Sequence, residues 1–245
     1  MREGSYSWST QSHTAFDTSI VLIDTDEGIT GVGECCPLGP TYLPAYADGV
    51  RAGIAQLAPS LIDHDPTQLD HINAVMDTHL KGHPYVKSAL DMACWDILGK
   101  AANLPLYILL GGKLQDSVTL YKVVTRADPA AMAERIPEYR DQGFRQFQVK
   151  VGESPATDII RIHRVAQEMR AGEVLNADAN TGWKQHEALQ VADAIADLGR
   201  QTGIRVTFEQ PCLSYHECLA VRQHTDLPFV LDECMDSIGA LLQGY

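Results

Sequence analysis

The sequence predicts an α/β protein in two parts: an α+β part, followed by a part of the (β/α)8 or TIM-like barrel type. Two observations predict this fold. Residues 1–113 open with alternating apolar and polar residues around a turn and continue in helical stretches. From residue 114 on, strands and helices alternate in units of about 30 residues, a length typical of parallel barrels. A doubly wound open sheet has a similar period and remains the alternative fold.

The first part begins with a predicted β-hairpin. Residues 19–36, SIVLIDTDEGITGVGECC, alternate apolar and polar positions around the turn-forming DEG. A loop rich in proline and glycine, CPLGPTYLPAY, follows at residues 36–46. The clearest helix is predicted over residues 85–100, where apolar residues recur at helical spacing and Asp96 and Lys100 form an i,i+4 pair.

The second part contains five predicted strands, each followed by a predicted helix or the start of one. The strands are VTLYKVV (118–124), FRQFQVKVG (144–152), EVLNADAN (173–180), RVTFEQP (205–211) and PFVLDEC (228–234). A closed barrel has eight strands, and an open partial barrel would expose unpaired apolar sheet edges. We therefore expect the sequence to be a truncated gene product that, taken alone, folds poorly and lacks activity.

Composition and charge argue against several classes of function. The formal net charge is −13 and no lysine/arginine cluster is present, which disfavours a nucleic-acid or anionic-membrane surface. No apolar run reaches the length of a membrane span, and the first residues lack the apolar core of a signal peptide. The six cysteines show no CxxC spacing, so we expect reduced thiols and a cytoplasmic location.

Charged groups recur once per unit, at the end of each later predicted strand. These ends carry Lys150, Asp178 followed by Asn180, Glu209, and Asp232 followed by Glu233. Because the C-terminal ends of parallel barrel strands converge on one mouth, we expect the groups to meet there. Carboxylates brought together repel one another unless a cation compensates them, and oxygen ligands suit Mg²⁺. One acid at a strand end is more often a helix N-cap, but four successive strands with such ends favour a functional site.

Five sequence motifs, taken in order along the chain, resemble those of the enolase superfamily in its mandelate racemase/muconate lactonizing enzyme branch. They are KSALDMACWDILGKAANLPLYILLGG (87–112), VKVG (149–152), NADAN (176–180), FEQP (208–211) and LDE (231–233). The resemblance covers nearly the whole chain. It implies that residues 1–113 form the α+β capping domain, with its first strand missing, and that residues 114–245 form a partial (β/α) barrel.

The resemblance also implies a reaction, the Mg²⁺-assisted removal of a proton α to a carboxylate through an enediolate. Lys150 matches the second lysine of the family's KxK motif, an acid/base that faces the α-carbon. The pKa of such a lysine, next to a cation in a closed pocket, would fall towards the working pH. Asn180 and Glu233 would orient the ligands and the lysine. Three acids match the family's metal ligands: Asp178, Glu209 and Asp232.

Two positions depart from the family pattern. Gln148 stands where the KxK motif has its first lysine, and its amide would instead donate a hydrogen bond to the substrate carboxylate. The family's partner lysine lies on a sixth strand, which would come after residue 245. A two-base reaction therefore depends on residues that this sequence does not contain.

The loop at residues 36–46 is similar to that of family members acting on proline-derived substrates, the hydroxyproline betaine 2-epimerases and cis-3-hydroxyproline dehydratases. Tyr42 would stack on the substrate ammonium, although packing of the loop explains this tyrosine equally well. The first expectation is a racemase or 2-epimerase of a proline-like amino acid or betaine. The alternatives are a syn-dehydratase of cis-3-hydroxyproline, acid-sugar or cycloisomerase chemistry, and an inactive fragment or non-catalytic metal-binding paralogue. A small-molecule carboxylate is the expected partner, and the full-length protein is expected to be a homo-oligomer.

Overall fold

The computed structural model describes residues 4–9 and 11–244 of the chain. It forms two compact units, one of Ala15–Val118 and one of Met1–Thr14 with Thr119–Tyr245. None of the helices in the described ranges combines the length and the hydrophobicity of a membrane span.

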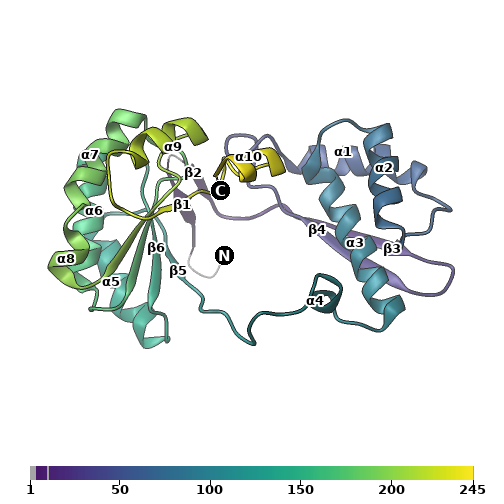
Figure 1. Cartoon of the computed structure of the whole chain (residues 1–245), viewed down its shortest axis with the longest axis horizontal. Coiled ribbons are helices and arrows are strands. Elements are labelled where there is room, and N and C mark those ends of the chain that lie inside the picture. Colours follow the sequence, from purple (N-terminus) through teal and green to yellow (C-terminus); the bar gives the residue numbers. More distant parts are fainter. Residues whose placement is uncertain (1–3, 10, 245) are drawn as a thin grey trace. The chain divides into compact units, whose positions relative to one another are not determined.

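The unit Ala15–Val118 is an antiparallel hairpin packed against helices, as the sequence predicts (Figure 1). Its elements are β3 (Ser19–Asp24), β4 (Thr30–Cys35), α1 (Ala47–Leu57), the 3-10 helix η1 (Ala58–Ser60), α2 (Leu69–His79), α3 (Pro84–Ala102) and α4 (Leu106–Leu109). Gly33 of β4 lies so close to α3 that a Cβ would be 1.9 Å from the carbonyl oxygen of Ala89. The hairpin sequence therefore needs a glycine where the strand meets this helix.

The second unit contains a parallel sheet whose strands follow one another in chain order, β5-β6-β7-β8-β9. A doubly wound sheet would reverse its strand order at a switch point, so the described sheet is of the barrel type. Its elements are β5 (Lys122–Val124), α5 (Pro129–Asp141), β6 (Gln146–Lys150), α6 (Pro155–Glu168), β7 (Val174–Asp178), α7 (Gln185–Ile195), α8 (Leu198–Thr202), β8 (Arg205–Glu209), α9 (Tyr215–Arg222), β9 (Phe229–Val230) and α10 (Ile238–Gly244).

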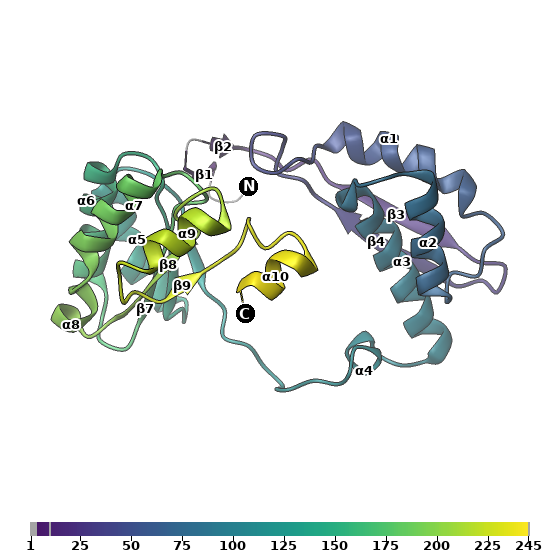
Figure 2. The same ribbon diagram turned by 45° about the horizontal axis from the view of Figure 1, so that its top comes forward.

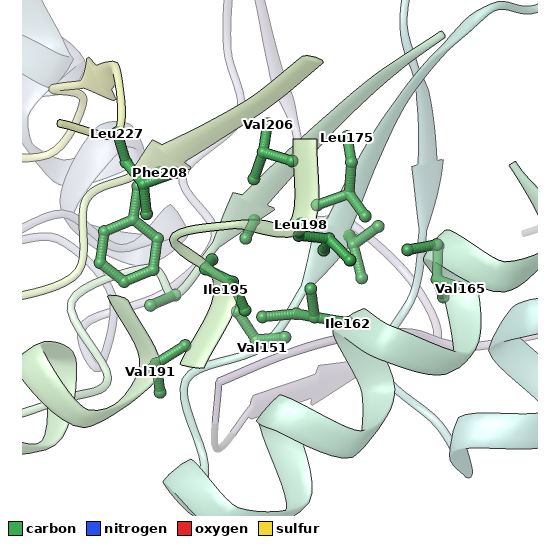
Figure 3. Packing of buried hydrophobic residues seen from close by; sticks show 14 of the residues in the cluster. Val151, Ile162, Val165, Leu175, Val191, Ile195, Leu198, Val206, Phe208 and Leu227 are labelled. Carbon is green, nitrogen blue, oxygen red and sulfur yellow. The ribbon is translucent and has the colours of Figure 1, made fainter. Parts of the chain in front are cut away.

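The two faces of this sheet have different side chains. Figure 3 shows residues of β7 and β8, such as Leu175 and Phe208, packed with Ile162 of α6 and Ile195 of α7 in one buried cluster. Because successive strand residues point to opposite faces, the residues between the apolar ones point away from the helices. This alternation explains why Lys150 is bracketed by valines: the valines join the helix-facing core and the lysine faces the other side.

All five strands of the sheet are shorter than predicted, and in proportion to length the difference is largest for β5 and β9. β5 begins only at Lys122, and β9 comprises only Phe229–Val230, so Asp232 and Glu233 lie beyond the end of the strand. In the β8–β9 register, the residue that would pair with Asp232 is Pro211. The pairing ends before this point, because the carbonyl of Gln210, a residue with a φ of 32°, accepts the amide of Thr181 and not that of Asp232.

The short hairpin of β1 (Tyr6–Trp8) and β2 (Gln11–His13) belongs to the unit that carries the parallel sheet (Figure 2). The amide of Ser7 donates to the hydroxyl of Thr125 at 2.6 Å, and the amide of Ser9 donates to the carbonyl of Val151 at 3.1 Å. The family resemblance predicts a capping domain over residues 1–113. These hydrogen bonds attach β1 to the ends of β5 and β6, and the boundary between the two compact units falls between Thr14 and Ala15.

Gly152→Ala should lower the free energy of unfolding more than Gly143→Ala. Both glycines have positive φ (95° and 100°), so both alanines carry a backbone cost, about 1–3 kcal/mol. A Cβ at Gly152 would also lie 2.1 Å from the carbonyl oxygen of Ala179, whereas one at Gly143 would meet nothing within 4 Å. Urea denaturation of both variants measures the difference, and equal losses would contradict the close packing at Gly152.

Candidate active site

Three charged side chains form a row at the C-terminal ends of β6, β7 and β8. The strand register pairs Lys150 with Asp178 and Asp178 with Glu209. Paired residues of neighbouring parallel strands point to the same side of the sheet. All three residues are buried, with exposed fractions of 4%, 0% and 6%. The structure therefore brings together three of the residues that the sequence singles out.

A second row of polar side chains lies two residues earlier on the same strands, where Gln148 pairs with Asn176 and Asn176 with Thr207. The hydroxyl of Thr207 donates to Oδ1 of Asn176 at 2.7 Å, and Nδ2 of Asn176 donates to Oε2 of Glu209. Nε2 of Gln148 donates to the same oxygen at 2.9 Å. In this structure the Gln148 amide thus binds Glu209. Asn176 and Thr207 were not among the predicted site residues; the pattern that could have indicated them is a polar residue two positions before the acid that ends β7 and before the acid that ends β8.

Lys150 is held from two sides. Its Nζ donates to Oδ2 of Asp178 at 2.5 Å and lies 5.8 Å from the ring centroid of Tyr6, whose hydroxyl also hydrogen-bonds to it. Burial lowers the pKa of Lys150, but the attraction of Asp178 and Tyr6 raises it by more, so the net pKa is raised. The chain's own groups therefore shift this pKa in the opposite direction from that expected beside a cation. Tyr6 was not predicted as a site residue, because its position depends on hydrogen bonds between β1 and residues more than 100 positions later in the chain.

Burial also disfavours the charged forms of the neighbouring acids. It raises the pKa of Glu209 to about 7, with repulsion by Asp178 adding to the effect and hydrogen bonds from Gln148 and Asn176 opposing it. Burial raises the pKa of Asp178 as well, against the attraction of Lys150. The site therefore holds more carboxylate than its one lysine compensates.

The remaining predicted residues lie next to this row. The backbone amide of Asn180 donates to Oδ1 of Asp178 at 2.8 Å, and its Nδ2 donates to Oε1 of Glu233 at 3.0 Å. Burial raises the pKa of Glu233, opposed by the hydrogen bond from Asn180. Asp232 is exposed and follows β9, with its backbone amide bound to the side chain of Gln210.

The described residues contain no group of three His, Cys, Asp or Glu side chains already arranged to hold a metal ion. The donor chemistry nevertheless fits a hard cation, because carboxylate and amide oxygens are the ligands of Mg²⁺. Two such oxygens, Oδ1 of Asn180 and Oε2 of Glu233, are buried without a hydrogen-bond partner. The assignment of Asp178, Glu209 and Asp232 as metal ligands stays a prediction.

Tyr42 lies in the unit Ala15–Val118, in the loop between β4 and α1, and is half-buried. Its backbone amide donates to the carbonyl of Gly39 at 3.2 Å, within a turn. The contact of Tyr42 with a substrate stays a prediction.

The fold and the site together define a protein of the (β/α)-barrel class, with a row of charged groups at the C-terminal ends of its parallel strands. Residues 5–111 match the mandelate racemase/muconate lactonizing enzyme N-terminal domain, and residues 131–243 match the enolase C-terminal domain-like model. The chain belongs to the mandelate racemase/muconate lactonizing enzyme family of the enolase superfamily. The predicted family and fold class are thereby confirmed.

Two curated relatives show how similarity is distributed within the family. The chain is 49% identical, over its whole length and 65% of the relative, to cis-3-hydroxy-L-proline dehydratase of Roseibium aggregatum. It is 31% identical, over 95% of its length and 62% of the relative, to N-succinyl-L-Arg/Lys racemase of Bacillus cereus. The chain thus spans less than two thirds of the length of either relative.

Two solved structures from Roseovarius nubinhibens ISM have the same fold. A mandelate racemase/muconate lactonizing enzyme matches with a TM-score of 0.91 and 39% identity, covering 98% of this chain and 63% of that one. A putative enzyme of this family, complexed with magnesium, matches with a TM-score of 0.88 and 35% identity, covering 98% and 65%.

Glu209→Gln should flatten the pH dependence of stability in the metal-free protein. The folded pKa of about 7 exceeds the ordinary value of 4.5, so the folded state binds this proton more tightly than the unfolded state. The resulting stability is present below about pH 4.5 and is lost as the pH rises towards 7. The difference between a pKa of 4.5 and one of about 7 corresponds to roughly 3 kcal/mol.

Urea denaturation in EDTA at about pH 5 and about pH 8 measures this effect. Glu134→Gln, which changes an exposed acid of α5, is the matched control and should leave the slope unchanged. If Glu209→Gln and Glu134→Gln gave the same slope, the assigned pKa of Glu209 would be wrong.

Proposed function

We propose that the native protein carrying this chain is a dehydratase of a cis-3-hydroxyproline-type substrate. In this reaction the α-proton is removed and the 3-hydroxyl leaves as water. The row of Lys150, Asp178 and Glu209 is the observation that carries the chemistry. The substrate class is supported by 49% identity along the whole chain to cis-3-hydroxy-L-proline dehydratase.

This proposal reverses the order of the expectations drawn from the sequence, which placed a racemase or 2-epimerase first. The racemase relative is 31% identical, against 49% for the dehydratase. Both reactions would begin with removal of an α-proton, so the row itself is compatible with either one. The identity difference favours the alternative of the sequence analysis over its first expectation.

Lys150 is the proposed base, with Nζ taking the α-proton. It is buried, and it is the one lysine in the row at the strand ends. The proposed role requires Nζ to be released from Oδ2 of Asp178, its hydrogen-bond partner in this structure. Mg²⁺, held by Asp178, Glu209 and Asp232, would stabilise the negative charge that develops on the substrate carboxylate.

The stereochemistry of such a substrate constrains the second proton transfer. In a cis-3-hydroxyproline the hydroxyl and the carboxylate share one face of the ring, so the α-hydrogen lies on the face opposite the hydroxyl. Elimination is therefore anti, not syn as the sequence analysis assumed. The acid that protonates the leaving hydroxyl would face Lys150 across the ring and belongs to a different part of the site.

The polar row below would keep the acids in place during the reaction. Thr207 orients Asn176, and Asn176 and Gln148 both donate to Oε2 of Glu209. Donors fixed in this way favour the ionised carboxylate, the form that binds a cation.

The racemase or 2-epimerase reading is the second candidate. Besides the racemase, the chain is 32% identical over 89% of its length to L-Ala-D/L-Glu epimerase of Bacillus subtilis. Such a reaction would share the step at Lys150 and differ in returning a proton to the opposite face of the α-carbon.

One experiment separates the two candidates. The native protein is incubated with Mg²⁺ and cis-3-hydroxy-L-proline in D₂O and followed by proton NMR. Loss of the substrate with formation of a dehydrated product supports the dehydratase. Deuterium at an inverted α-carbon without dehydration supports the 2-epimerase. No reaction with this compound, with proline or with proline betaine would contradict both proposals.

Lys150→Ala should reduce the reaction rate by about 10²–10⁴-fold, the range for loss of a positioned acid/base. The Mg²⁺ affinity, measured by calorimetry, should be retained or raised, because Lys150 is not a proposed ligand and its Nζ competes with the cation for Asp178. Lys81→Ala, at an exposed lysine of the other unit, is the control and should react like the native protein. Undiminished α-proton exchange in Lys150→Ala would show that another group is the base.

A further inference from the structure

Backbone pairing between β8 and β9 ends one step before Asp232. The amides of Phe208 and Gln210 donate to the carbonyls of Pro228 and Val230, at 2.8 and 2.9 Å. In a regular parallel ladder the carbonyl of Gln210 would accept the next amide, that of Asp232. This hydrogen bond is replaced by a different one in the structure.

The backbone of Gln210 directs its carbonyl towards the loop that follows β7. Its φ is 32°, in the left-handed region that non-glycine residues seldom adopt, and the carbonyl accepts the amide of Thr181 at 2.9 Å. The main chain of β8 therefore cannot fix the position of Asp232.

The side chain of Gln210, in place of its backbone carbonyl, accepts the hydrogen bond from the amide of Asp232. Its Oε1 accepts the amide of Asp232 at 2.8 Å and lies 3.5 Å from the amide nitrogen of Cys234. The residue is fully buried, with an exposed fraction of 0%. One amide oxygen thus holds the turn that carries both Asp232 and Glu233.

The other end of the same amide fixes its orientation. Nε2 of Gln210 donates to the carbonyl of Cys212 at 2.9 Å and lies 3.7 Å from Sγ of Cys218, in α9. Both cysteines are buried. A reversed amide would set its NH₂ against the amide hydrogen of Asp232, so only this orientation satisfies both ends.

We propose that Gln210 is a positioning residue that holds Asp232 near Glu209 and thereby sets the affinity of the acid cluster for Mg²⁺. Gln210 follows Glu209 directly in the chain, so a single residue links the proposed ligand at the end of β8 with the one in the turn after β9. As far as the metal is concerned, this inference rests on the proposed function. Removing an outer partner of a metal ligand typically weakens metal binding by about 10–100-fold.

Two measurements on the native protein and its variants test the inference. Hydrogen exchange reports the protection of the backbone amides at residues 232–234, and calorimetry with Mg²⁺ alone reports its Kd. Gln210→Met keeps the side-chain length and removes both polar ends, so it should accelerate exchange at residues 232–234 and raise the Kd about 10–100-fold. Gln210→Glu keeps an acceptor for the amide of Asp232, so its exchange rates at residues 232–234 and its Mg²⁺ Kd should lie between those of the native protein and Gln210→Met.

Val221→Ala is the matched control, because Val221 is fully buried in α9 and belongs to the apolar core cluster. It should lower the melting temperature and leave the Mg²⁺ Kd unchanged. Unchanged exchange at residues 232–234 in Gln210→Met would overturn the hydrogen-bonding role of Gln210. Faster exchange with an unchanged Kd would overturn its role in metal binding. A native protein that binds no Mg²⁺, yet shows the exchange effect, would contradict the proposed metal site while the positioning of Asp232 by Gln210 stood.

Discussion

The in-register pairing of β6, β7 and β8 is the constraint on which the rest of the site depends. It aligns Lys150, Asp178 and Glu209 in one row. A shift of one strand by one residue would turn its charged side chain into the helix-facing core and an apolar one into the site. Burial of residues such as Val149 and Phe208 against the helices therefore fixes the register, and the register assembles the charged row. The register of β6, β7 and β8 thus determines both the packing of the core and the geometry of the site.

That coupling explains how much could be predicted from the sequence. Alternation around Lys150 and the recurrence of acids at strand ends predicted both the sheet and the row. The length of β9 could not be predicted, since the ladder ends where the carbonyl of Gln210 accepts the amide of Thr181 in place of that of Asp232, and no local sequence pattern shows this change of partner. Tyr6 could not be placed either, because no local pattern shows that β1 docks at the ends of β5 and β6.

The electrostatics of the site arise from burial. Asp178 and Glu209 are nearly inaccessible to water, so burial raises their pKa values, and Lys150 compensates only part of their charge. A divalent cation would relieve this repulsion and would compete with Lys150 for Asp178. Once the cation neutralises Asp178, the ion pair between Asp178 and Lys150 would weaken, and Lys150 would be free to act as a base. The choice between dehydration and epimerisation depends on groups beyond the row, which explains why comparison with relatives ranks the candidates better than the row does.

The most direct test of this account is a crystal structure of the native protein soaked with Mn²⁺, which replaces Mg²⁺ and scatters anomalously. The account predicts one anomalous peak, coordinated by carboxylate oxygens of Asp178, Glu209 and Asp232, with Nζ of Lys150 no longer bonded to Asp178. Mn²⁺ bound elsewhere, or a retained bond between Lys150 and Asp178 beside an occupied site, would contradict the claim that this row is a metal-assisted acid–base centre.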